Sequence, residues 1–286
     1  MLIGAHVSTA GGLDKALARG EERACEAIQI FNQSPRAWKP TNYSDDDFDA
    51  FNEAFAASSV GSVVIHMIYL INPAGSDRTL RSKSLASLTH ALRVGDRIGA
   101  AGVVVHPGAL KGGTRPPAKK RAAKMVADAL SATESCPVLL ENTAGNEALL
   151  GRDFPELADL IELAGGGPRL GLCIDTCHLH ASGFDMRSEE GITSMLDELD
   201  SEVGLDRLSY LHVNDSRDER GSNRDRHENL GKGKIGRAAF RTFLSEPRLA
   251  GVPAVLETPG PDKKGTDRAE VLLAKRLRNE GLKERG

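Results

Sequence analysis

The sequence predicts an α/β protein built as a single (β/α)8 TIM barrel over residues 1–286. Three observations support this fold: eight short apolar runs, segments with helical spacing between them, and a chain length of 286 residues that suits one such barrel. No linker, repeat or low-complexity segment divides the chain. A doubly wound open sheet would show the same alternation of elements, so the pattern leaves that architecture as the alternative.

The eight apolar runs have the composition of buried strands. They are apolar nearly throughout, instead of alternating with polar residues, which is typical of parallel strands covered on both faces. Each run ends in polar residues or, as at 27–31, is followed directly by them. The expected strands cover residues 2–6, 27–31, 62–66, 102–106, 137–142, 170–175, 208–215 and 254–258.

The segments between these runs carry helix signals. Ser44 can cap a helix whose first turn is acidic, and Leu85, Leu88 and Leu92 recur at steps of three and four. Two other segments run into glycine, a common stop signal. The expected helices cover residues 45–57, 77–99, 122–132, 154–166, 191–204, 238–246 and 267–286.

Composition excludes several classes of protein. The net charge of −3 argues against a chain that coats nucleic acid with its whole surface, and the basic clusters at 111–121 and 217–234 have the pattern of solvated loops. Four cysteines are too few for a disulfide framework in a chain of this length. The sequence shows no signal-peptide pattern and no membrane-spanning run, so we expect a cytoplasmic, reduced protein without membrane contact.

The ends of the predicted strands carry an unusual set of residues. In a barrel, functional groups project from the carboxyl ends of the strands. Seven of the eight ends are histidine or carboxylate, and together they would leave costly uncompensated charge unless divalent cations bind there. Neutral imidazole and carboxylate suit Zn²⁺, and also Mn²⁺ or Fe²⁺. The eight end residues are His6, Phe31, His66, His106, Glu141, Asp175, His212 and Glu257.

Three further residues could form an additional open metal site. We expect the loop after Asp175 to bring His178 to this end of the barrel. The segment "DRH" contains Asp225 and His227, and a D-x-H pair in extended backbone places both side chains on one side. Together the three residues offer nitrogen and oxygen ligands for one ion.

Other conspicuous residues favour structural roles. Cys173 lies in mid-strand and Cys177 has no C-x-x-C partner, so we expect both thiols to pack in the interior. The stretch "GKGKIG" at 231–236 matches a dinucleotide-binding pattern but follows a polar loop, which indicates a tight turn near the site instead.

Several longer motifs together resemble the endonuclease IV family of apurinic/apyrimidinic endonucleases. They are "GAHVSTAGG", "ENTAG", "GLCIDTCH", "HVNDS", "GSNRDRH", "GKGKIG" and "VLET", in the family's order and spacing from Leu2 to about Pro261. The resemblance implies a (β/α)8 barrel that binds three zinc ions. One ion would be held by His66, His106 and Glu141. The second would share Glu141 and take Asp175, His212 and Glu257. The third would take His178, Asp225 and His227.

The resemblance also implies an activity of the deoxyribonuclease IV type in base excision repair. The implied substrate is double-stranded DNA with abasic sites or blocked 3′ ends. Hydrolysis 5′ to the abasic sugar would leave a 3′-hydroxyl and a 5′-deoxyribose phosphate, through water activated between metals, with Glu141 as the shared catalytic carboxylate. The expected protein is a monomer. His6 would be a hydrogen-bonding neighbour of the ligands, and His90 and His180 would lie outside the metal sites.

By the same resemblance, residues of two further loops would recognise the damaged site in DNA. Tyr69 and Leu70 in "HMIYLIN" would enter the base stack, and Arg36 in "SPRAW" would fill the gap. Basic residues in 217–226 and 232–234 would contact the phosphate backbone. Met67 and Lys232 depart from the family pattern and leave lesion preference and DNA affinity open.

Two other functions fit part of the pattern. A metal-dependent sugar isomerase or epimerase on a similar barrel would need one or two metals, and has no use for the third site. A non-catalytic binder of damaged DNA would not require a complete set of nine ligands.

Overall fold

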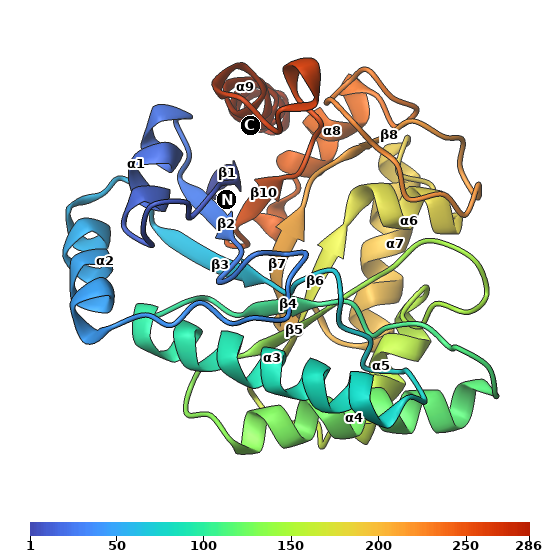
Figure 1. The fold of residues 1–286 in the computed structure, drawn as a ribbon. Helices are drawn as coiled ribbons and strands as arrows, with labels where there is room; N and C mark the ends of the chain where they lie inside the picture. Colours follow the sequence, from blue (N-terminus) through green and yellow to red (C-terminus); the bar gives the residue numbers. More distant parts are fainter.

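Eight parallel strands form a closed barrel in a computed structural model that describes every residue from Met1 to Gly286 (Figure 1). The order around the barrel is β1-β10-β7-β6-β5-β4-β3-β2. Closure confirms the predicted TIM barrel and excludes the open sheet. The barrel strands are β1 (Ile3–His6), β2 (Ala27–Ile30), β3 (Ser62–His66), β4 (Val103–Val105), β5 (Val138–Glu141), β6 (Leu170–Asp175), β7 (Leu208–His212) and β10 (Ala254–Leu256).

Helices surround the barrel, and a short antiparallel pair of strands lies outside it (Figure 1). The pair consists of β8 (Asp215–Ser216) and β9 (His227–Glu228). None of the helices is both long and apolar enough to cross a membrane. The helices are α1 (Lys15–Glu22), α2 (Asp45–Ala57), α3 (Arg78–Ile98), α4 (Arg115–Ser131), α5 (Phe154–Leu163), α6 (Thr176–Ser182), α7 (Glu189–Glu202), α8 (Arg237–Leu244) and α9 (Arg268–Arg285), with short 3-10 turns η1 (Leu205–Arg207), η2 (Pro247–Leu249) and η3 (Pro261–Lys263).

Local capping explains why the predicted boundaries of α2 and α3 were accurate. Ser44 accepts a hydrogen bond from the Asp47 backbone, while the Asp47 side chain accepts one from Ser44, so a capping box begins α2. Asp77 caps α3, and Gly99 ends it in the left-handed conformation with φ 60°. These signals lie within a few residues of each helix end, where the sequence alone displays them.

Four elements differ from the sequence prediction. The helices α1 and α6 were not predicted, because both are short and α6 is buried on every side instead of amphipathic. The seventh strand ends at His212, since Asp215 leaves the barrel to pair in β8. The basic cluster at 111–121 is a loop only in part, because α4 begins at Arg115 with prolines in its first turn.

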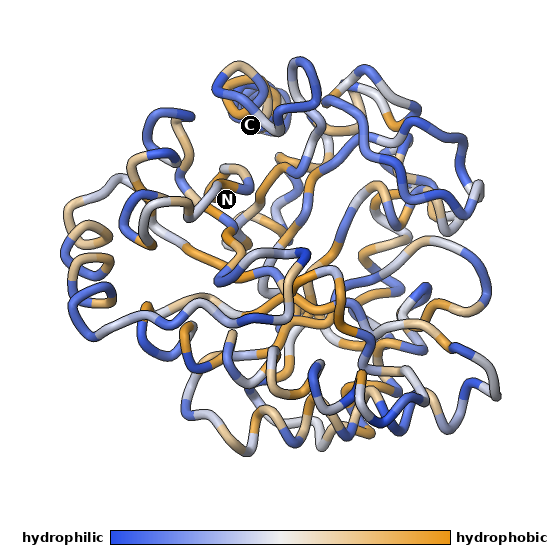
Figure 2. The backbone as a smooth tube through the Cα atoms, viewed as in Figure 1, coloured by the Kyte–Doolittle hydropathy of each residue, from blue (hydrophilic) through white to orange (hydrophobic).

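The interior has two apolar layers. A cluster of 62 buried residues fills the space between strands and helices. A smaller cluster inside the barrel consists of Ala27, Val64, Val104, Leu139, Cys173, Tyr210 and Val255. Gly4 is the residue of β1 at the level of this layer. It leaves no room for a side chain, because a Cβ atom there would lie 1.5 Å from the Ala27 carbonyl oxygen. In Figure 2 the barrel strands are mostly hydrophobic, whereas the loop around β8 is mostly hydrophilic.

Candidate metal centre at the barrel mouth

A ring of polar side chains lies directly above the apolar layer inside the barrel. Side chains of a strand alternate between its two faces, so the residue two positions after each interior residue points to the same side. Applied to every strand, this step gives His6, Gln29, His66, His106, Glu141, Asp175, His212 and Glu257. The residue of β2 in this ring is therefore Gln29. The prediction of Phe31 at this position was wrong, because Phe31 stands a further two residues along.

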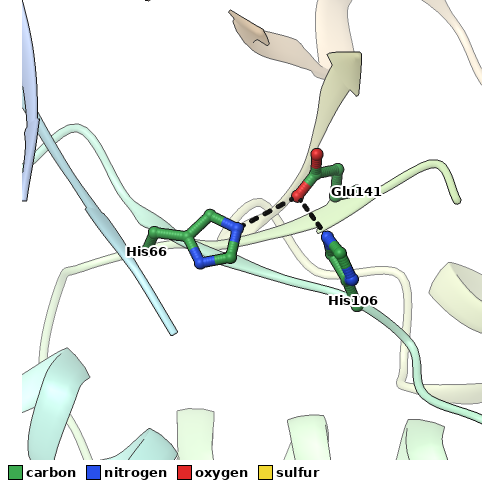
Figure 3. Close-up of side chains that lie close together, drawn as sticks. All are labelled: His66, His106 and Glu141. Atoms are coloured by element: carbon green, nitrogen blue, oxygen red, sulfur yellow. Dashed lines mark hydrogen bonds and ion pairs between the residues drawn. The ribbon is translucent and has the colours of Figure 1, made fainter. Parts of the chain in front are cut away.

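The first cluster joins three neighbouring strands. His66 Nε2 lies 3.3 Å and His106 Nε2 lies 2.9 Å from the same oxygen, Oε2 of Glu141 (Figure 3). All three ligand atoms lie within 4.8 Å of one another. His66 and Glu141 are buried, whereas the His106 side chain is 45% exposed, so this cluster faces solvent on one side.

The second cluster uses the other oxygen of Glu141. Its Oε1 atom lies 2.8 Å from Nδ1 of His212, which in turn lies 3.3 Å from Oε2 of Glu257. Oδ2 of Asp175 lies 4.0 Å from the same nitrogen. Glu141 therefore stands between two groups of donors and presents one oxygen to each.

The third cluster comes from outside the barrel strands. His178 lies in α6, where Asp175 caps the helix by accepting a hydrogen bond from the His178 backbone at 2.9 Å. Asp225 and His227 come from the hairpin that contains β8 and β9. Oδ2 of Asp225 lies 3.1 Å from His178 Nε2, and its Oδ1 lies 3.1 Å from His227 Nε2. Asp175 lies between this cluster and the second, since its Oδ2 is 3.6 Å from His227 Nε2.

Hydrogen bonds fix which ring nitrogen of each histidine is free. Nδ1 of His66 donates to the Met67 carbonyl at 2.7 Å, and Nδ1 of His178 donates to the Asn142 carbonyl at 2.8 Å. Nε2 of His212 donates to Oε1 of Gln29 at 2.7 Å. The remaining nitrogen of each ring then points at carboxylate oxygens. This arrangement orients imidazoles as metal ligands, because the outer bond sets the tautomer.

The free nitrogen of His227 gives an independent test of this fit. Its Nε2 is buried without a hydrogen-bond partner, although Asp225 and Asp175 oxygens are nearby. A buried imidazole nitrogen with carboxylate oxygens of two residues around it is well placed to bind a divalent cation together with them. The donor set of nitrogen and oxygen suits a divalent ion such as zinc.

Neighbouring charges in the site shift one another's pKa values. Burial raises the pKa of Glu141, but His212 and His106 outweigh burial and hold that pKa well below its usual value. Burial likewise opposes the charge on Glu257, yet His212 and His66 lower its pKa to about 2. In His227, burial is outweighed by Asp175 and Asp225, which raise the pKa to about 9. Protonated imidazoles can thus balance the charge of the carboxylates.

These donors adjoin an open cavity of about 310 Å³. Its lining includes residues of all three clusters, together with Tyr69. The cavity opens the candidate metal ligands to the surroundings of the protein.

Comparison with known proteins identifies the family. Residues 17–277 match the family model described as xylose isomerase-like TIM barrel. A protein of Streptomyces coelicolor described as "Probable endonuclease 4" is 41% identical over 282 residues, which cover 97% of this chain and 95% of that protein. The chain belongs to the endonuclease IV family.

Solved structures agree with membership of the endonuclease IV family. The crystal structure of endonuclease IV from Thermus thermophilus matches with a TM-score of 0.84 and 36% identity, covering 99% of this chain and 100% of that one. A D-tagatose 3-epimerase-like protein matches with a TM-score of 0.74 at 17% identity. The second likeness shows the fold alone.

The residues that the endonuclease IV resemblance assigns to DNA recognition lie on two loops, one of which reaches this centre. Tyr69 is 67% exposed and lines the cavity. Its backbone N–H donates to the Pro35 carbonyl at 3.1 Å, which joins its loop to the one that carries the exposed Arg36. Leu70 is only partly exposed and packs against the core. Of the three residues, only Tyr69 lines the cavity at the centre.

The two departures from the endonuclease IV pattern have different surroundings. Met67 is buried with 2% exposure, and only its backbone carbonyl reaches the site, as the acceptor for His66. Lys232 lies in the "GKGKIG" loop, whose backbone is held by the buried Asp215 carboxylate. The N–H groups of Gly231, Gly233, Ile235 and Gly236 donate to Asp215 at 2.9–3.3 Å.

Ion pairs with acidic neighbours offset part of the positive charge of the basic segment 217–234. Arg226 forms a two-point ion pair with Asp218, and Lys234 pairs with Glu219 at 2.6 Å. Acidic residues of the same segment thus offset part of its charge. Arg220 and Lys232 form no ion pair, although Nε of Arg220 donates to the Gly183 carbonyl at 2.6 Å.

Three amides that hold the ligands were not predicted from the sequence. Gln29 contacts His212, and it also donates to Oε1 of Glu257 at 2.6 Å. Asn142 accepts from the Asp175 backbone at 2.7 Å, and Asn214 donates to Oδ2 of Asp175 at 2.6 Å. A step of two residues along β2 from Ala27, which lies inside the barrel, identifies Gln29. The two asparagines follow strand ends but carry no signal that separates them from ordinary capping residues.

The remaining histidines and the thiols lie as the sequence analysis expects, except that Cys177 also lies near two candidate metal ligands. His6 contacts Gln29, whereas His90 and His180 belong to none of the clusters. Cys173 is buried inside the barrel, and burial raises the pKa of its thiol to about 12. Cys177 is buried too, but its sulfur also lies within 4.8 Å of ligand atoms of Asp175 and His227.

Proposed function

We propose that this chain is a zinc-dependent endonuclease of DNA repair that hydrolyses the phosphodiester 5′ to an abasic site in duplex DNA. The products would be a 3′-hydroxyl and a 5′-deoxyribose phosphate, and the same chemistry would trim blocked 3′ ends. Membership of the endonuclease IV family supports this activity. The single structural observation that carries it is the placement of Glu141 between two donor clusters.

Three zinc ions per chain fit the donor sets, with Mn²⁺ or Fe²⁺ as alternatives at some sites. His66, His106 and Glu141 would hold one, and Glu141, Asp175, His212 and Glu257 a second. His178, Asp225 and His227 would hold the third. Ions bound there would ionise water near neutral pH and offset the charge that develops on the phosphoryl oxygens.

The chain's own residues set the geometry for this reaction. Glu141 would fix the separation of the first two sites, because its two oxygens point in different directions. Gln29, Asn142 and Asn214 would keep the histidine rings and Asp175 in place. The half-exposed His106 marks the open side, from which the scissile phosphate would approach.

We further propose that Arg36, Tyr69 and Leu70 recognise the lesion. Exposed Tyr69 can unstack bases beside the abasic sugar, and Arg36 can occupy the vacated space. A site without its base is easier to open, so wedge residues would favour damaged DNA over intact DNA. We also propose that the protein acts as a monomer in the cytoplasm.

One pair of measurements tests this function. Elemental analysis of the purified protein should give about three zinc ions per chain. The same preparation should cleave a duplex that contains one abasic site, and a chelator should abolish cleavage. About one metal per chain, with turnover of a sugar and no incision of DNA, would support the sugar isomerase instead. The third cluster disfavours that alternative, because isomerisation needs no ligands at His178, Asp225 and His227.

A further inference from the structure

Phe31 occupies a distinct position above the ring of metal-binding candidates. It follows β2 and stands two residues beyond Gln29, so its side chain lies one layer higher. Its ring centroid is 4.5 Å from that of His6 and 5.7 Å from that of His66. On the outer side, its centroid is 5.4 Å from that of Tyr69 at an interplanar angle of 74°.

The backbone of Phe31 is fixed from the neighbouring loop. Its carbonyl accepts a hydrogen bond from Oγ1 of Thr9 at 3.1 Å. The ring lines a cavity of about 930 Å³, which Tyr69 also lines. Tyr69, like Glu257, lines both this larger cavity and the 310 Å³ cavity at the candidate metal ligands.

Few contacts hold the side chain of Tyr69 in place. It is 67% exposed, and its backbone is held by the Pro35 carbonyl. Phe31 is the only aromatic ring that contacts its side chain, in an edge-to-face arrangement. A side chain that must enter a base stack loses less entropy if one orientation is already favoured.

We infer that Phe31 is a positioning residue, which holds Tyr69 in the orientation required to unstack DNA at the lesion. This inference rests on the proposed function, because it assumes that Tyr69 is the wedge. Phe31 acts through Tyr69 and not through the metal ligands. His66 has its own support, since its Nδ1 donates to the Met67 carbonyl.

The test uses Phe31→Leu, which keeps an apolar side chain but removes the ring. The probe is a duplex with a tetrahydrofuran abasic analogue beside 2-aminopurine, whose fluorescence rises on unstacking. Losing one aromatic pair should weaken binding of this duplex about fivefold. It should also reduce the fluorescence rise, with zinc content unchanged and affinity for intact duplex unchanged. Phe31→Tyr, which retains the ring, should restore both signals.

Two comparisons show whether the effect passes through Tyr69. Phe55→Leu removes an aromatic ring that stacks on Phe51 in α2, away from the centre, and should leave both signals at the wild-type level. In a Tyr69→Ala background, Phe31→Leu should cause no further loss of affinity. Additive losses, or loss of zinc from Phe31→Leu, would overturn the inference.

The outcomes also separate this inference from the proposed function. If the wild-type protein neither prefers nor cleaves the abasic duplex, the proposed function fails. If the wild-type protein does both and Phe31→Leu unstacks DNA equally well, only the role of Phe31 is refuted.

Discussion

The Oε1 atom of Glu141 lies 2.8 Å from Nδ1 of His212, and both side chains are buried. The other carboxylate oxygen points to His66 and His106. One side chain thus connects two groups of donors that come from opposite parts of the barrel. The chemistry that we propose depends on this connection more than on any other contact.

Glu141→Gln should reduce cleavage of abasic duplex by at least about 1,000-fold, because a neutral amide cannot hold two cations. Some DNA binding should remain, since the surface that contacts DNA is unchanged. Cleavage rates and gel-shift affinities measure the two effects separately. Glu147→Gln, the same change at an exposed position in the loop after β5, is the control. An active Glu141→Gln protein would refute the mechanism.

Gln29→Leu should weaken metal binding by about 10- to 100-fold, because His212 loses the acceptor that sets its tautomer. Gln29→Glu should also weaken binding, since a carboxylate cannot donate to Glu257. Titration against a competing chelator measures both affinities. Wild-type affinity in both variants would mean that Gln29 does not support the ligands.

His227→Ala should remove one metal ion per chain and leave the other two. The third cluster is built on α6 and on the β8–β9 hairpin, whereas the first two are built on barrel strands. Metal content after dialysis gives the stoichiometry. His180→Ala, on the same helix as His178 but outside every cluster, should retain all metal. Loss of every ion from His227→Ala would contradict independent assembly of the sites.

Metal affinity should increase as the pH rises from 6 to 9. Burial lowers the pKa of His227, but Asp175 and Asp225 outweigh burial and raise it to about 9, so this ring holds a proton below that pH in the metal-free protein. A metal ion must displace that proton, and displacement becomes easier as pH rises. Calorimetry in buffers with different ionisation enthalpies would measure the protons released. Release of none at pH 7 would be the contrary result.

Asp215→Asn should lower the free energy of unfolding by about 2 kcal/mol, because several loop N–H groups lose a charged acceptor. Gly233 lies so close that a Cβ atom would be 2.3 Å from the Ser216 carbonyl, so this loop has little room to adjust. Chemical denaturation measures the change. Asp206→Asn, at an exposed position, is the matched control and should be nearly neutral.

Much of the site was predictable because strand geometry is local. Once eight strands are recognised, a step of two residues from each interior position gives His66, His106, Glu141, Asp175, His212 and Glu257. Phe31 was misplaced because the apolar run of β2 continues one residue beyond the strand, and Gln29 was read as part of its interior. The caps of α2 and α3 were equally local.

The sequence by itself determined the α/β class, most of the polar ring and the types of its ligands, because alternation and capping depend on near neighbours. Only the tertiary structure decided that the strands close into a barrel, and only it brings the residues that the resemblance grouped together into contact. Barrel closure turns the two oxygens of Glu141 towards different histidines, and it brings α6 to the β8–β9 hairpin so that His178 meets Asp225 and His227. Such contacts join distant segments, and no local pattern in the chain encodes their distances.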